Sequence, residues 1–151
     1  MPTQFNFVST YRHSLDEKSR LALPGKMRDE LQKSENSEEM MAFPDPDGYL
    51  ALYPLERWQM IVESIEQIDD YEDRMAAQWM YGGESEAVKI DKNGRLLVPP
   101  RLREKLDLGK EIVVRGGFNK IMLWPAALID AQEAKSVEIV QKNHKSWNLP
   151  R

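Results

Sequence analysis

The chain has 151 residues, of which 41% are hydrophobic and 30% are charged, so it can bury a core beneath a polar surface. It contains no cysteine, which excludes disulfide bonds, thiolate metal sites and a thiol nucleophile. No apolar run approaches the length of a membrane span, and the first residues do not resemble a signal peptide. We therefore expect a cytoplasmic protein without a membrane partner.

The net charge of −4 is unevenly distributed along the chain. Residues 1–33 hold six basic and four acidic residues, residues 34–87 hold two and fourteen, and residues 88–151 hold thirteen and seven. A phosphate responds to charge within a screening length of about 8 Å and not to the total. The two end segments could therefore bind nucleic acid if the acidic middle faced away from it; a mixed soluble surface is the alternative.

The sequence contains an internal repeat. Residues 15–31 align with residues 90–106 at an offset of 75, and residues 49–54 (YLALYP) align with residues 120–125 (KIMLWP) at an offset of 71. The first copy therefore carries four extra residues, which fit the polar stretch at 34–39. The identical pairs are Asp16/Asp91, Arg20/Arg95, Leu21/Leu96, Pro24/Pro99, Arg28/Arg103 and Leu31/Leu106. The same features in the same order indicate a duplicated structural unit.

Each copy predicts two hairpins around one short helix. In the first copy, strands are expected at residues 5–15, 20–23, 40–43 and 49–53, with Met27 and Leu31 on the short helix. In the second copy, strands are expected at residues 86–90, 95–98, 112–115 and 119–124, with a helix from Pro100 to about Leu106. Pro24 and Pro99 end the second strand of each copy because proline cannot donate to a strand ladder.

Helical segments follow each copy. After Pro54 the apolar residues recur at helical spacing, and a second helix over 71–81 is predicted to stop at Gly82-Gly83. Residues 126–142 are also predicted to be helical, with contacts through Leu128, Ile129 and Val137. We expect these helices to pack mainly on their own sheet, with contacts between subunits as the alternative.

A loop with the pattern Asp-x-x-x-Arg joins the first two strands of each copy, as DEKSR at 16–20 and DKNGR at 91–95. A guanidinium group carries five donors in a planar fork, which can bind a phosphate or the O6/N7 edge of guanine. An aspartate repels phosphate, so we expect Asp16 and Asp91 to orient their loops by accepting hydrogen bonds from turn amides or from the arginine. The alternative is an ion pair that closes the turn and binds no ligand.

Arg20 and Arg95 are therefore the first candidates for binding DNA. Lys18, Lys89 and Lys92 would add charge for phosphate contacts, and Arg12 lies on the strand that enters the first loop. The arginines of the short helices are expected to be solvated or structural; they are Arg28, Arg101 and Arg103.

With two such loops at matching places, the sequence resembles the MraZ family of bacterial regulators, whose two repeats belong to the AbrB-like (SpoVT/AbrB) DNA-binding class. The resemblance runs from about Phe7 to Trp124 and includes the stretch GGFNKIMLWP at 116–125. Similar proteins usually have Lys-Gly-Arg in both loops, where this chain has Lys18-Ser19-Arg20 and Asn93-Gly94-Arg95, and Phe-x-Gly near the start, where it has Phe7-Val8-Ser9. Because Ser19 lacks the freedom of glycine, we expect the first loop to differ in shape from the second.

The resemblance implies an α+β fold in which two tandem AbrB-like swapped-hairpin units form a pseudo-two-fold β-barrel with flanking helices. The corresponding division is a first unit at 7–54, a helical connection at 55–83, a second unit at 84–125, and a C-terminal helix and tail at 126–151. The resemblance also implies sequence-specific binding of double-stranded DNA at short direct repeats, upstream of a division and cell-wall gene cluster that includes the protein's own gene. A ring-like homo-oligomer associated with the nucleoid would bind these direct repeats.

Two other classes of function are alternatives to a DNA-binding regulator. An enzyme is disfavoured because the only histidines are His13 and His144 and no nucleophile or phosphate-loop motif occurs. Residues 45–48 resemble part of a calcium loop but lack the other ligands, so a turn is predicted. We therefore expect no catalytic residue, metal, cofactor or small-molecule substrate. The second alternative is an antitoxin-like, AbrB-related protein-binding module that holds a partner through its acidic segment, with support from the tail around Trp147.

Overall fold

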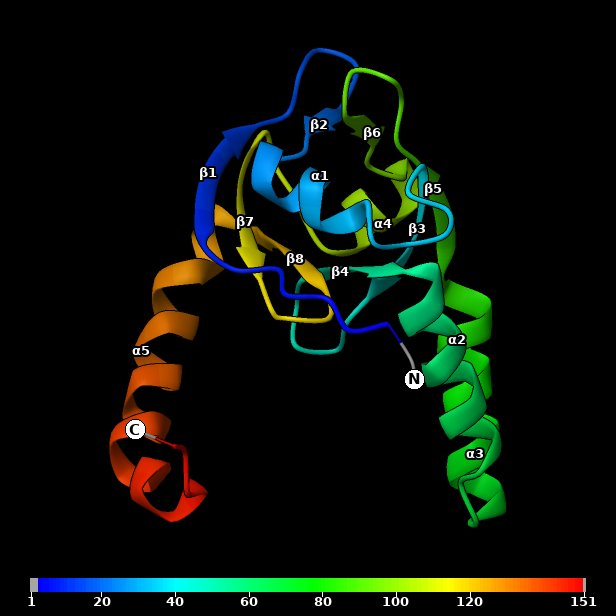
Figure 1. Ribbon diagram of the computed structural model, residues 1–151, viewed down its shortest axis with the longest axis vertical. Coiled ribbons are helices and arrows are strands. Elements are labelled where there is room, and N and C mark those ends of the chain that lie inside the picture. The colour runs from blue at the N-terminus through cyan, green and yellow to red at the C-terminus, as the bar shows by residue number, and fades with distance from the viewer. Residues whose placement is uncertain (1–2, 151) are drawn as a thin grey trace.

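The computed structural model describes residues 3–150, and its elements follow the predicted repeat (Figure 1). The first copy forms β1 (Thr10–Ser14), β2 (Arg20–Ala22), α1 (Gly25–Leu31), β3 (Glu39–Pro44) and β4 (Leu50–Pro54), followed by α2 (Leu55–Glu66), α3 (Tyr71–Ala77) and the π-helical turn η1 (Gln78–Gly82). The second copy forms β5 (Glu86–Lys89), β6 (Arg95–Leu97), α4 (Pro100–Lys105), β7 (Glu111–Gly116) and β8 (Ile121–Pro125), followed by α5 (Ala126–Asn143) and the 3₁₀ turn η2 (His144–Trp147). The α+β class is confirmed. Of the predicted tail, Arg151 lies outside the described residues.

The two copies exchange hairpins. The strands form a six-stranded antiparallel sheet in the order β1-β7-β8-β4-β3-β5 and a separate two-stranded ribbon, β2-β6. The β7–β8 hairpin of the second copy pairs with β1 of the first, and the β3–β4 hairpin of the first pairs with β5 of the second. β1 and β5 are the two edges of the sheet, so the expected closure into a barrel does not occur.

The strand registers show that a pseudo-two-fold axis relates the two copies. The β4–β8 pairing is centred on Ala51 opposite Met122, and the β2–β6 pairing is centred on Leu21 opposite Leu96. These partners are equivalent under the repeat offsets of 71 and 75, and the flanking pairs exchange equivalent residues. The axis therefore passes between β4 and β8 and between β2 and β6.

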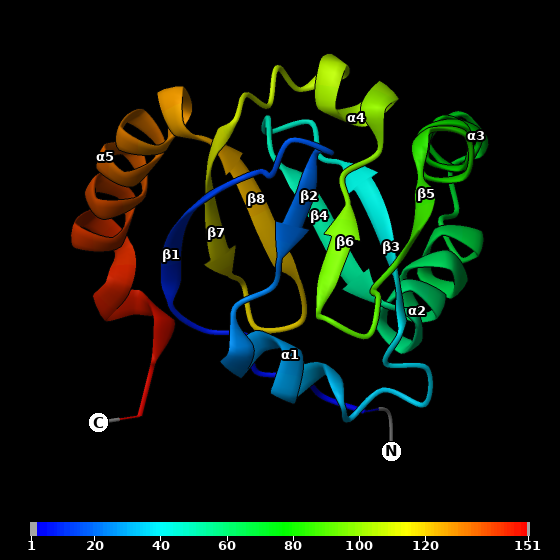
Figure 2. The ribbon, with the colours of Figure 1, turned by 90° about the horizontal axis from the view of Figure 1, so that it is seen from above.

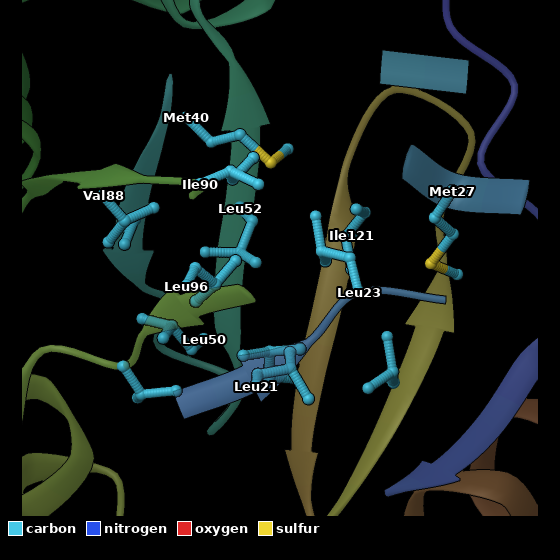
Figure 3. Close-up of a cluster of buried hydrophobic side chains, with 14 of the residues drawn as sticks. Leu21, Leu23, Met27, Met40, Leu50, Leu52, Val88, Ile90, Leu96 and Ile121 are labelled. Carbon is cyan, nitrogen blue, oxygen red and sulfur yellow. The ribbon is translucent and has the colours of Figure 1, made fainter. Parts of the chain in front are cut away.

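The ribbon and the short helices α1 and α4 cover one face of the sheet (Figure 2). Leu21 and Leu96 of the ribbon and Met27 of α1 are almost completely buried and lie in one cluster with sheet residues such as Leu50 (Figure 3). Leu102 of α4 is buried in the same cluster. Burial of each such side chain is worth about 1.5–3 kcal/mol. The predicted helix residue Leu106 is only partly buried.

An aromatic cluster covers the other face and anchors the longer helices. The Phe43 and Tyr81 rings stack with centroids 4.0 Å apart, and Trp58 of α2 and Trp124 of β8 pack in the same cluster. Burial raises the pKa of Tyr53 in this cluster to about 12. From α5 only Ile129 is buried here, so that helix is held at its first turns.

Beyond these anchors the helices leave the sheet and extend in one direction (Figure 1). The predicted contact of Ile129 is confirmed, and Leu128, although 44% exposed, lies beside Gly48 in the β3–β4 turn. Val137 is 44% exposed, so its predicted contact, and the packing of most of α5 on the sheet, are wrong. Gly82-Gly83 does not stop the preceding helix either, because Gly83 keeps a helical φ of −87° and helical backbone continues to Glu84. Glycine permits a left-handed helix end but does not require one. None of the helices within residues 3–150 is both long and apolar enough to span a membrane.

Candidate nucleic-acid interface

The two Asp-x-x-x-Arg loops project from one end of the molecule, at opposite ends of the β2–β6 ribbon (Figures 1 and 2). The helices α2, α3 and α5 extend toward the other end. Residues 55–84, which form α2, α3 and η1, hold much of the negative charge of the acidic middle. The chain therefore separates its two loops from its most acidic helices.

Each loop is closed by its aspartate in the same way. Oδ1 of Asp16 accepts hydrogen bonds from the backbone N–H groups of Lys18 and Arg20, at 2.8 and 2.9 Å. Oδ1 of Asp91 accepts from those of Asn93 and Arg95, at 2.8 and 3.0 Å. These are the turn amides that the sequence analysis expected the aspartates to bind.

The two loops also share their backbone conformation. Ser19 has a φ of +62° and Gly94 a φ of +78°, and each donates its N–H to the aspartate carbonyl at 2.9 Å. The expectation that the first loop differs in shape is therefore wrong. The aspartate cap holds Ser19 in a left-handed conformation that costs roughly 1–2 kcal/mol for a residue with a Cβ.

These hydrogen bonds keep both aspartates ionised. The backbone hydrogen bond from Arg20 is the largest cause that lowers the pKa of Asp16, and the one from Arg95 lowers the pKa of Asp91 in the same way. Both carboxylates are solvent-exposed. The loops therefore keep their caps at neutral pH.

Arg20 and Arg95 share the outward face of the ribbon. Leu21 and Leu96 point into the core, so their strand neighbours point outward, as period-two alternation requires. Nε of Arg20 donates to Oδ2 of Asp16 at 2.8 Å, so the first loop contains the ion pair considered as an alternative. The Arg95 guanidinium is exposed, and Asp91 is bound through backbone N–H groups only, within residues 3–150.

The other predicted cations divide into two groups. Lys18 and Lys92 are exposed in the loops themselves. Arg12 pairs with Val113 and Lys89 pairs with Glu39, and these registers place both on the side of the sheet that carries the aromatic cluster. The structure brings Lys18, Arg20, Lys92 and Arg95 to one end, and it does not bring Arg12 and Lys89 onto the outward face of the ribbon.

Leu97 also belongs to this surface, and it was not among the residues predicted from the sequence. It lies opposite Arg20 on the outward face of the ribbon and is 50% exposed. The alternation of Leu96 and Val98, both buried, with Leu97 between them was the signal that could have revealed it. An exposed leucine between two arginines gives this face an apolar contact beside its charges.

The short-helix arginines make contacts within the protein, as expected. Arg101 forms ion pairs with Glu84 and Glu86, at 2.6 and 3.2 Å, and its hydrogen bond is the first cause that lowers the pKa of Glu84. Arg28 and Arg103 bind the two loops. Residues 45–48 form a plain turn, in which the Gly48 N–H donates to the Asp45 carbonyl.

The fold and the site define a two-repeat, swapped-hairpin α+β protein that presents a pair of equivalent, cation-bearing loops at one end. The family model described as "MraZ protein, putative antitoxin-like" matches residues 7–78 and 80–147. The chain therefore belongs to the MraZ family. Each matched segment contains one repeat together with helices that follow it.

Curated relatives agree with this family. The chain is 34% identical over 130 residues to a protein of Pseudomonas fluorescens (strain SBW25) named "Transcriptional regulator MraZ", and the match covers 85% of this chain and 86% of the relative. The protein of the same name from Pseudomonas putida (strain W619) matches to the same extent. That of Pseudomonas syringae pv. syringae (strain B728a) is 33% identical over the same share of both chains.

Proposed function

We propose that this chain is a DNA-binding transcriptional regulator that contacts duplex DNA through its two Asp-x-x-x-Arg loops. The observation that carries the proposal is the position of Arg20 and Arg95, which share one outward face as equivalents under the pseudo-two-fold axis. The names of the relatives support a regulatory role. The acidic helices extend away from this end, so they do not oppose the approach of a polyanion.

Each side chain has a chemical task in the proposed interface. The Arg20 and Arg95 guanidinium groups bind phosphate or guanine edges, and Lys18 and Lys92 neutralise further phosphates. Asp16 and Asp91 hold the turn amides, so less conformational entropy is lost when DNA binds. Leu97 is positioned for apolar contact with a thymine methyl group.

Arg12 and Lys89 were also candidates, and we propose that they lie outside the direct interface. Their strand registers place them on the face opposite the ribbon. Their charges can attract DNA only over a distance, and salt screens that attraction beyond about 8 Å. An Arg12→Ala variant therefore measures how far along the sheet DNA contact extends.

Two loops with a few cations give weak, salt-sensitive binding, and we propose that oligomers overcome this weakness through avidity. Exposed apolar residues occur on the helical segments and the tail that extend away from the loops, among them Tyr71 of α3 (66% exposed), Trp79 of η1 (78%) and Leu149 of the tail (60%). A subunit that covers these residues would leave the loops free. In the proposed assembly, a ring-like homo-oligomer in the cytoplasm, associated with the nucleoid, binds short direct repeats upstream of the division and cell-wall gene cluster that contains its own gene.

A protein-binding, antitoxin-like role is the second candidate, favoured by the family description and by the surface of α3 and η1. There Tyr71, Met75 and Trp79 are exposed among acidic side chains. A pull-down that yields one stoichiometric partner, from a protein that does not bind DNA, would support this role against the regulator.

The test of the regulator is a mobility-shift titration with DNA from upstream of the protein's own gene, at several salt concentrations, with light scattering on the same sample. Arg20→Ala and Arg95→Ala should weaken binding and lower the salt slope by about 0.9 for each phosphate that the variant no longer neutralises. Arg57→Ala removes the same charge from α2 and serves as the matched control. Wild-type affinity in both folded loop variants, or no binding by the wild type at low salt, would refute the proposal.

A further inference from the structure

Each loop is held by a helix arginine of the opposite repeat. Nη2 of Arg28, on α1 of the first copy, donates to the Lys92 carbonyl in the second loop at 2.8 Å. Nη1 of Arg103, on α4 of the second copy, donates to the Ser19 hydroxyl in the first loop, and its Nε donates to the Leu108 carbonyl at 2.9 Å. Arg28 and Arg103 are equivalent under the repeat offset of 75, so the exchange is reciprocal.

The backbone repeats the same exchange. The Leu23 N–H of the first copy donates to the Gly94 carbonyl at 2.9 Å, and the Val98 N–H of the second copy donates to the Ser19 carbonyl at 3.1 Å. Leu23 and Val98 are buried where the ribbon strands end, so these donors are fixed by the core. Each loop is therefore attached to the opposite repeat through both backbone and side-chain hydrogen bonds.

The Ser19/Gly94 difference changes what each arginine holds. A Cβ at Gly94 would lie 2.9 Å from Nη1 of Arg28, so the absence of a side chain lets the guanidinium cross this residue and reach the Lys92 carbonyl. In the first loop the Ser19 side chain occupies the equivalent place, and Arg103 binds its hydroxyl instead. Each helix arginine therefore holds the opposite loop, one through a backbone carbonyl and the other through a serine hydroxyl.

We propose that Arg28 and Arg103 are positioning residues that hold the DNA-facing loop of the opposite repeat, so that Arg20 and Arg95 keep a fixed separation and orientation. Neither helix arginine needs to touch DNA for this purpose. A hydrogen bond from a charged donor is among the stronger ones in proteins, and pre-ordering a loop reduces the entropy lost on binding. The effect on DNA rests on the proposed function, whereas the attachment of each helix to the opposite loop does not.

The experiment is amide hydrogen exchange on the full-length chain, followed by DNA titration of the same variants. Arg28→Ala should speed exchange of the amides of residues 93–95 by roughly tenfold and leave residues 18–20 within about twofold. Arg103→Ala should do the reverse. Arg28→Lys should restore much of the protection because a lysine can still donate to the Lys92 carbonyl. Arg101→Ala, which removes an arginine bound to Glu84, is the control and should change neither loop.

In the titration, Arg28→Ala and Arg103→Ala should each weaken binding roughly three- to tenfold while the salt slope stays at the wild-type value. A slope lowered by about one would mean that these arginines contact phosphate, which overturns the positioning role. The positioning role is also overturned if hydrogen exchange speeds up only in the loop of the mutated repeat, or in neither loop. If Arg103→Ala fails to fold, Ser19→Ala removes the acceptor without altering the helix, and exchange in the first loop should still rise.

The two proposals fail in distinguishable ways. The wild-type chain could fail to bind operator DNA while the variants still change hydrogen exchange in the loop of the opposite repeat. That result would contradict the proposed regulatory function but would support the attachment of each helix to the opposite loop. Alternatively, the wild-type chain could bind DNA while Arg28→Ala and Arg103→Ala keep the wild-type hydrogen-exchange rates and DNA affinity. That result would contradict the positioning role but would not contradict the proposed regulatory function.

Discussion

Replacement of Gly116 by alanine should detach the N-terminal segment from the sheet. Gly116 ends β7, and a Cβ added there would lie 2.4 Å from the carbonyl carbon and oxygen of Phe7 and 2.5 Å from the Val8 nitrogen. These are backbone atoms, so no rotamer change can relieve the contact. The segment must move away from β7 as a whole.

The cost follows from what this segment buries. Phe5 and Phe7 are 4% and 1% exposed and stack with ring centroids 5.7 Å apart. Burial of one phenylalanine side chain is worth about 1.5–3 kcal/mol. Displacement would also break reciprocal backbone hydrogen bonds between Phe7 and Phe118, each worth about 1 kcal/mol. With partial relaxation, we expect the free energy of unfolding to fall by about 3–5 kcal/mol.

Urea unfolding followed by circular dichroism measures this difference, with Gly109→Ala as the matched control. No atom lies within 4 Å of a Cβ at Gly109, so its unfolding free energy should stay within about 0.5 kcal/mol of wild type. Equal unfolding midpoints for Gly116→Ala and wild type would refute the claim that the backbone contact is rigid. Full hydrogen-exchange protection of residues 5–9 in Gly116→Ala would refute it as well.

Three further outcomes are expected. Because hydrogen bonds lower the pKa of Asp16 and Asp91 in the folded chain, their contribution to loop order should be complete above the unfolded value of about 3.9 and should be lost as pH falls through the lower folded pKa. NMR titration of the two carboxyl groups checks this, and a folded pKa above the unfolded value would contradict it. Ser9 has a φ of +79°, so Ser9→Gly should raise the unfolding free energy by about 0.5–1 kcal/mol in a denaturant titration. Asp91→Asn keeps an acceptor oxygen for the Asn93 and Arg95 amides, so it should weaken operator binding less than Asp91→Ala in a mobility-shift titration.

The internal repeat explains why most elements could be predicted from the sequence. The expected strand at 112–115 is β7 at Glu111–Gly116, and the expected helix from Pro100 is α4 at Pro100–Lys105. The first strand was the exception, because it was expected at 5–15 and occupies Thr10–Ser14. The left-handed conformation of Ser9 interrupts it, and a single bridge joins Phe7 to Phe118. A serine does not by itself indicate such a break, whereas the glycine that similar proteins usually have at this place does.

The missed features depend on contacts between distant parts of the chain. The sequence indicates a helix over α5 with some apolar residues, but it cannot show that Val137 extends past the sheet that would cover it. The sequence placed Arg12 and Lys89 near the loops, but the strands that pair with them come from the exchanged hairpins and decide which face they occupy. The contacts of Arg28 and Arg103 with the opposite loops could not be predicted without that exchange.

If the chain binds direct repeats as an oligomer, as proposed, the symmetry within one subunit constrains how it contacts them. Arg20 and Arg95 are related by a pseudo-two-fold axis, and two-fold symmetry in a protein matches inverted half-sites in DNA. Direct repeats are related by translation, so a single subunit cannot place equivalent arginines on two of them in the same orientation. Each direct repeat would therefore be read by a separate subunit, and the Ser19/Gly94 difference would distinguish the two loops within it. On this reasoning a DNA fragment with one repeat should bind one subunit weakly, and affinity should rise steeply with a second repeat only if subunits associate. An equal affinity for one repeat and two, measured with an assembled protein, would contradict the assignment of one subunit to each repeat.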